Sequence, residues 1–176
     1  MTIKTIAIHF FSFRLETLFI TSALTLTTFA NAFSQASLAE LKDSILTARE
    51  LYFDKASPGV DAVTDFNGYP EFWAIDQVNT HTQAFRISRY LEEVLYTELY
   101  LVQGKKLIYA IEEIKTLPLN LYAQFVWRCE YFIKDDKVID YISLGHGKTE
   151  NNHWDPDEIL LQFNTRKAEL EKIRQG

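Results

Sequence analysis

The chain is poor in the residues that cross-link or loosen a polypeptide. It contains one cysteine, Cys129, so no internal disulfide can form and the fold must depend on its apolar core. It has only six glycines and four prolines, which excludes a low-complexity linker protein. Because 47% of its 176 residues are hydrophobic and 14% are aromatic, the composition is typical of one globular domain.

The apolar run near the N-terminus is too short for a typical membrane-spanning helix. Leu18–Phe29 is an uncharged run of about a dozen residues, whereas a span needs roughly 20. Lys4 and Arg14 precede this run, and the small-x-small segment Ala30–Ala32 follows it. This three-part arrangement is typical of a secretory signal peptide. We therefore predict that residues 1–32 are cleaved and that the protein is periplasmic or secreted.

A second interpretation of the N-terminus stays open. The segment before the apolar run is long, and Ile6, Ile8 and the pair Phe10–Phe11 make it more apolar than a usual signal peptide. An uncleaved anchor, and with it an envelope structural protein, is therefore an alternative. No cysteine lies near the cleavage site, so a lipoprotein-type attachment site is absent.

The charge that remains after cleavage limits the partners. Without Lys4, Arg14 and Glu16, which are the charged residues of the leader, the chain has 16 basic and 23 acidic residues and a net charge of −7. A charge of this sign repels phosphate. We therefore expect no nucleic-acid partner, and membrane contact only through an uncleaved N-terminus.

Residues 33–176 are predicted to form a single α+β domain with a helix near each end. Ser37 and Glu40 have the spacing of a capping box, and apolar residues then recur every three or four positions until about Lys55. Asp155 suits the N-cap of a second helix, Pro156–Arg174, in which proline occupies the first helical position.

Residues 57–72 are predicted to form a long loop. The segment contains Pro58, Gly59, Asn67, Gly68 and Pro70, which are typical of turns. Its aromatic residues either close one end of the sheet or form a surface that faces a ligand.

The stretch from residue 73 to residue 144 is predicted to form an antiparallel meander. Glu98–Ile111 resembles Cys129–Ile142 at an offset of 31 residues, and each copy has an apolar strand, a polar turn and a second apolar strand. This is the pattern of a β-hairpin, and two hairpins in tandem form a meander. Strands are predicted at 73–79, 84–91, 94–102, 106–114, 121–133 and 137–144. The predicted fold is α+β, with an N-terminal helix, an antiparallel meander sheet of about five or six strands, and a C-terminal helix.

The hairpin segments are similar to those of a known group of proteins. They read Tyr-Leu-Val-Gln-Gly-Lys-Lys-Leu-Ile from Tyr100 and Tyr-Phe-Ile-Lys-Asp-Asp-Lys-Val-Ile from Tyr131. They resemble the YYF-dGKL-type hairpins that follow a leading helix in small exported bacterial domains of unknown function. The resemblance covers about residues 98–142, and the second turn departs from it by lacking glycine. It implies no catalytic residues.

Aromatic residues are the candidates for ligand binding. Tyrosine combines an apolar body with a polar tip, which suits interfaces. A cross-strand ladder is expected from Tyr96, Tyr100, Tyr109, Tyr122 and Tyr131, either as ordinary sheet packing or as a binding surface. The predicted binding residues are Tyr69, Phe72, Trp73, Tyr100 and Tyr131. We expect a non-enzymatic module that binds a protein, a peptide or a small ligand without a cofactor, with an inhibitor of a secreted hydrolase as one form.

The enzymatic alternative depends on the polar loop before the second helix. His146, Glu150, His153 and Asp155 carry side chains that can bind zinc, but their spacing matches no familiar zinc motif. A metal-assisted hydrolase built on this loop remains an alternative, although a solvated loop that leads into a helix cap is the simpler interpretation.

Two other motifs are not expected to carry chemistry. Gly147-Lys148-Thr149 resembles the end of a phosphate-binding loop, but the glycine that such a loop requires is replaced by Ile142. Neighbouring carboxylates such as Glu112 and Glu113 point to opposite faces of a strand and cannot share a substrate.

Overall fold

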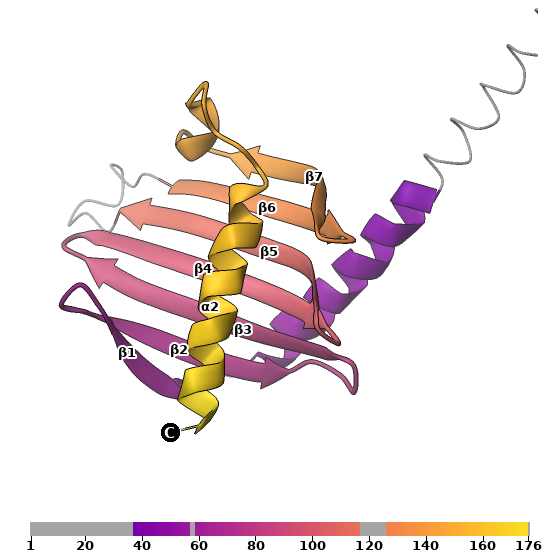
Figure 1. Cartoon of the computed structure of the whole chain (residues 1–176). Coiled ribbons are helices and arrows are strands. Elements are labelled where there is room, and N and C mark those ends of the chain that lie inside the picture. The colour runs from indigo at the N-terminus through magenta and orange to yellow at the C-terminus, as the bar shows by residue number, and fades with distance from the viewer. Residues whose placement is uncertain (1–36, 57–58, 117–125, 176) are drawn as a thin grey trace, which may run out of the picture. The chain divides into compact units, whose positions relative to one another are not determined.

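The computed structural model describes residues 37–56, 59–116 and 126–175 (Figure 1). The chain divides into two compact units, residues 1–44 and 45–176. In the first unit only residues 37–44 are described, and they are helical. The second unit contains the rest of this helix, which ends at residue 55, the sheet and the C-terminal helix α2 (Glu158–Gln175). The predicted signal peptide, residues 1–32, lies outside the described residues.

The sheet has seven antiparallel strands in simple meander order, and each strand pairs with the next along the chain. The α+β class with two flanking helices is confirmed, whereas the predicted count of five or six strands was wrong. The strands are β1 (Ala62–Phe66), β2 (Tyr69–Gln77), β3 (Thr82–Leu91), β4 (Val94–Gln103), β5 (Lys106–Thr116), β6 (Val126–Lys134) and β7 (Lys137–Leu144). Part of the predicted strand at 121–133 lies outside the described residues.

The additional strand comes from the segment that was predicted to be a loop. β1 and the start of β2 lie within residues 57–72 and form a hairpin around Asn67 and Gly68. Their φ angles are 54° and 87°, and a two-residue type I′ turn needs positive φ at both positions. The Asn-Gly pair was therefore a hairpin signal, although its neighbouring prolines favoured a loop.

The predicted tandem hairpins are confirmed as β4–β5 and β6–β7, and both carry the same irregularity. In β4–β5, Val102 pairs with Leu107 but Leu101 pairs with Tyr109, so Ile108 is an extra residue. The register of β6–β7 shifts at the equivalent place, where Ile139 is the extra residue. Such a β-bulge moves the following residues of its strand to the opposite face of the sheet.

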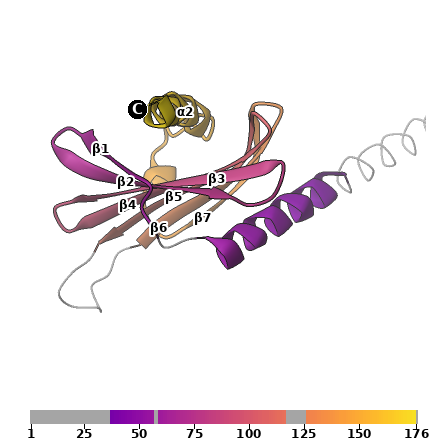
Figure 2. The ribbon, with the colours of Figure 1, turned by 90° about the horizontal axis from the view of Figure 1, so that it is seen from below.

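Helix α2 covers one face of the sheet (Figures 1 and 2). Its buried residues recur at the spacing of one helical face and are Ile159, Phe163, Arg166 and Leu170. The apolar members of this stripe join a core with sheet residues that include Trp73, Phe85, Tyr100, Trp127 and Tyr131. The fourth member, Arg166, is charged and therefore needs partners inside the protein.

Helix α2 begins two residues later than predicted. Asp155 Oδ1 accepts a hydrogen bond from the Asp157 backbone (2.9 Å), within the turn that precedes the helix. Asp157 Oδ1 in turn accepts one from the backbone of Val138 on β7 (3.1 Å). These contacts tie the start of α2 to the edge of the sheet.

The other face of the sheet receives residues 45–55 of the N-terminal helix. Ile45 and Tyr52 are buried, and Arg49 lies 3.6 Å from the carboxylate of Glu130 on β6. Lys55 Nζ donates to the carbonyl oxygen of Val78 (3.2 Å). This part of the helix is therefore held by both apolar and charged contacts.

Candidate ligand-binding site

Arg166 lies in the middle of α2 with only 7% of its side chain exposed. All five of its N–H donors bind carboxylates. Nε donates to Glu98 (2.8 Å), Nη1 to Glu71 (3.2 Å) and Glu169 (2.9 Å), and Nη2 to Glu71 (2.9 Å) and Glu98 (3.0 Å). Glu71 is on β2 and Glu98 is on β4, so one side chain joins the helix to two strands. Such charge-assisted bonds are roughly twice as strong as neutral ones.

Arg89 on β3 completes a cluster of alternating charges. Its Nη1 donates to Glu71 (3.1 Å) and Glu98 (2.8 Å), while the rings of Phe66 and Tyr96 lie 4.5 and 5.1 Å from its guanidinium carbon. We refer to Glu71, Arg89, Glu98 and Arg166 as the buried ion cluster. Burial alone would raise the pKa of Glu98, but the hydrogen bonds and charges of the two arginines outweigh it and hold this pKa at about 2.

Another buried glutamate lies directly opposite Glu98. Glu112 on β5 pairs with Glu98 in the antiparallel ladder, so both side chains face α2. Like charges in this position repel one another unless each is compensated. Glu112 accepts hydrogen bonds from Lys148 Nζ (2.5 Å) and from the hydroxyl of Tyr131 (2.8 Å). Each member of the glutamate pair therefore has its own cation.

Two glycines bring Lys148 to this position. Gly145 has a φ of +81°, and a Cβ there would lie 2.0 Å from the backbone oxygen of Val126. A Cβ at Gly147 would lie 2.3 Å from the nearest ring atom of Trp127. Because neither residue has a side chain, the segment can lie against β6. Lys148, at the start of the short 3₁₀-helix η2 (Lys148–Glu150), then extends over the Trp127 ring toward Glu112.

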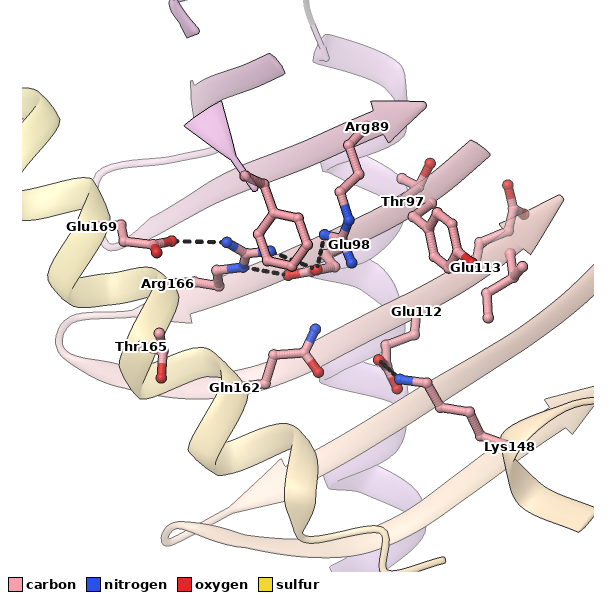
Figure 3. Close-up of a pocket in the computed structure, with 13 residues that line it drawn as sticks. Arg89, Thr97, Glu98, Glu112, Glu113, Lys148, Gln162, Thr165, Arg166 and Glu169 are labelled. Carbon is pink, nitrogen blue, oxygen red and sulfur yellow. Dashed lines mark hydrogen bonds and ion pairs between the residues drawn. The ribbon is translucent and has the colours of Figure 1, made fainter. Parts of the chain in front are cut away.

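These side chains line a cavity of about 370 Å³ between α2, η2 and the sheet (Figure 3). In Figure 3 Arg166 points from α2 toward Glu98, and Lys148 reaches Glu112 from the other side. Apolar surface comes from Phe66, Tyr96 and Ile114, and further polar groups come from Gln162, Thr165 and Glu169 on α2. We refer to this space as the α2 cavity.

The structure places the five predicted binding residues in two settings. Trp73, Tyr100 and Tyr131 are buried in the core beneath α2. The hydroxyl of Tyr100 donates to Glu98 (3.0 Å) and that of Tyr131 to Glu112, so these two tyrosines support the α2 cavity from below. Tyr69 and Phe72 lie on β2 outside the lining of this cavity.

The predicted tyrosine ladder is divided between the two faces of the sheet. Ala110 lies between Tyr100 and Tyr131 in the ladder, and these two tyrosines share the α2 face. Tyr109 faces the opposite side, where its hydroxyl donates to Glu130. Tyr96 lines the α2 cavity, and Tyr122 lies outside the described residues.

The polar loop does not gather the four side chains that were considered for zinc. His146 Nδ1 lies 2.5 Å from Glu150, whereas Asp155 binds the backbone of Asp157. Among residues 37–56, 59–116 and 126–175, no group of three or more histidine, cysteine, aspartate or glutamate side chains could hold a metal ion. Within the same ranges no helix is long and apolar enough to cross a membrane.

The comparisons with known proteins add no relative. No family model matches the chain, and neither a curated protein nor a solved structure is significantly similar to it. The resemblance to exported YYF-dGKL-type hairpin domains therefore stays a prediction.

Sequence reasoning missed all four residues of the buried ion cluster, and it gave no role to Glu112 or Lys148. Without the bulge at Ile108, the two-residue turn of this hairpin would place Ile111 opposite Glu98 and turn Glu112 to the other face. The available signal was the position of Arg166 within the apolar spacing of α2, where a charged residue needs buried partners.

Proposed function

We propose that the protein is an exported, non-enzymatic binding protein whose ligand occupies the α2 cavity. The observation that carries the proposal is a preformed cavity in which a few apolar side chains lie among charged groups that hydrogen bonds hold in place. A volume of about 370 Å³ falls within the range of small-ligand sites, which is roughly 300–1,000 Å³.

The walls of the α2 cavity are held in place before a ligand arrives. Arg166 is bound through every donor, and Glu112 is held by Tyr131 from the core. In a preorganised site, little binding free energy is lost in ordering the side chains of the protein. The arrangement therefore favours selective binding of a small group.

The reactive residue types nearby favour binding over catalysis. Cys129, on the same face of the sheet, is fully buried, and its burial raises the pKa of the thiol to about 11. It is thus a thiol rather than a thiolate at neutral pH. Glu98 is held ionised by two arginines, so it is not a proton donor at neutral pH.

Filling the α2 cavity tests this function. Thr165 lies at an exposed position of α2 and lines the cavity, while its hydroxyl donates only to the helix carbonyl of Leu161 (3.2 Å). We expect Thr165→Trp to change the free energy of unfolding by no more than about 0.5 kcal/mol, as at most surface positions, but to abolish ligand binding. A small-molecule screen by NMR chemical-shift change, run on the wild-type protein and the variant, measures this.

The matched control for the cavity experiment is Thr165→Ala, which should keep every ligand that the wild-type protein binds. Ligands that bind Thr165→Trp as tightly as the wild-type protein would place the binding site elsewhere and contradict the proposal.

Export is tested separately by the mass of the mature chain. After expression of the full-length chain in a bacterial host, we expect a product that begins at Phe33 and lacks residues 1–32, because the leader is too short to anchor. Mass spectrometry of the periplasmic and culture fractions measures this. An intact chain in the cytosol would contradict export, and an intact chain in the membrane fraction would indicate the uncleaved anchor.

A further inference from the structure

The buried ion cluster has no carboxylate oxygen left for a ligand. Each of the four oxygens of Glu71 and Glu98 already accepts two hydrogen bonds. The two carboxylates also balance the charges of Arg89 and Arg166. The cluster therefore holds α2 on the sheet but does not determine which charge the α2 cavity attracts.

The remaining charges of the α2 cavity are unbalanced in favour of carboxylate. Glu112 accepts one hydrogen bond at each oxygen, so it can accept more. Glu169 binds Arg166 through one oxygen, and 38% of its side chain is exposed. Glu113 has its own partners, Lys115 and Arg128. Glu112 and Glu169 thus carry two negative charges, and only the ammonium of Lys148 remains to balance them. The cavity therefore favours a cation.

Lys148 shows which cation fits. Its Nζ lies 2.5 Å from Glu112 Oε1 and 5.8 Å from the centroid of the Trp127 ring, while 47% of its side chain is exposed. A carboxylate and an aromatic ring form a site that suits an ammonium group. Because a half-exposed lysine side chain is flexible and well hydrated in water, an incoming group can replace it at little cost.

We propose that the α2 cavity binds a primary alkylammonium group, which takes the place of the Lys148 ammonium at Glu112. This inference rests on the proposed function and names the chemistry of its ligand. A free alkylamine and the lysine side chain of a peptide supply the same group. Lys148 is then an internal competitor that occupies the site until the ligand arrives.

The competition between Lys148 and the ligand predicts the direction in which each substitution changes the affinity for the ligand. If Lys148 occupies Glu112 nine-tenths of the time, its removal should tighten ligand binding about tenfold. Glu112→Gln removes the charge that the ligand needs and should weaken binding about tenfold or more. Glu171→Gln changes the charge of α2 by the same amount outside the α2 cavity and should leave binding unchanged.

Isothermal titration calorimetry on protein purified from cells that express the full-length chain measures these effects. The probes are 1,5-diaminopentane, as a free amine, and the capped tripeptide acetyl-Gly-Lys-Gly-amide, as a lysine side chain. Glutarate, which has a similar length and the opposite charge, is the negatively charged control probe. We expect one or both amine probes to bind the wild-type protein and to bind Lys148→Ala more tightly.

Binding of glutarate in place of the amines, or weaker amine binding by Lys148→Ala, would overturn the inference. The Lys148→Ala result stands by itself if Glu112→Gln fails to fold, which circular dichroism shows. Should neither amine bind while other molecules bind the wild-type protein but not Thr165→Trp, the proposed function holds and the alkylammonium inference fails. Ligands that bind Thr165→Trp with the same affinity as the wild-type protein would contradict the proposed function itself.

Discussion

Arg166→Ala is expected to lower the free energy of unfolding by about 3–5 kcal/mol, the cost of removing one partner from a buried ion pair. Glu71 and Glu98 would remain buried with Arg89 as their only cation. Urea denaturation measures the loss without screening charges. Arg174→Ala is the matched control, because Arg174 on the same helix is 39% exposed and its pairs contribute no more than about 1 kcal/mol.

The pH dependence of this loss identifies its electrostatic origin. The pKa of Glu98 is lowered from its ordinary value of 4.5 to about 2 in the folded protein. Because this pKa is lower in the folded chain, ionised Glu98 stabilises the fold fully above pH 4.5. This contribution, about 3 kcal/mol, is lost as the pH falls toward 2. The difference in the free energy of unfolding between wild type and Arg166→Ala should therefore become smaller over the same pH range. A difference that stays constant from pH 6 to pH 2.5 would show that Arg166 acts through packing alone.

Gly147→Ala is expected to destabilise the protein by about 2–3 kcal/mol, as overpacking against a buried side chain does. The new methyl group would overlap the ring of Trp127, which is fully buried and cannot move aside. The segment that carries Lys148 would then be displaced from β6. Urea denaturation gives the stability, and the indole N–H resonance of Trp127, which donates to Thr149 (3.3 Å), reports the displacement.

Gly104→Ala is the control for this second prediction. Gly104 has a φ of +63°, but a Cβ there would meet nothing within 4 Å. Alanine should therefore cost only the backbone strain of about 1–2 kcal/mol and leave the Trp127 resonance in place. An unchanged Trp127 resonance in Gly147→Ala would contradict the role of Gly147 in positioning Lys148.

The elements that were predicted correctly depend on neighbours in the sequence. The hairpins around residues 104–105 and 135–136 follow from apolar runs on both sides of a polar turn, and both are present. The two helices follow from apolar spacing, although α2 begins two residues later than the predicted cap at Asp155 implied. The hairpin at Asn67 and Gly68 was missed because Pro58 and Pro70 gave the same segment the composition of a loop.

The candidate site could not be predicted in the same way because it depends on distant residues. Arg166 lies 95 residues from Glu71 and 68 from Glu98 along the chain. Their meeting depends on where α2 crosses the sheet, which no local pattern encodes. The pairing of Glu98 with Glu112 depends in addition on Ile108 being left unpaired as a bulge in β5.

That extra residue has a consequence for how such a hairpin can change during evolution. Deleting Ile108 would make Leu107 and Tyr109 consecutive partners of Val102 and Leu101, so Glu112 would stay opposite Glu98 and on the side of the cavity. A bulge at this place can therefore absorb a change of length without moving a lining side chain to the other face of the sheet. Since the neighbouring hairpin carries an equivalent extra residue at Ile139, two adjoining strand pairs can gain or lose a residue in this way.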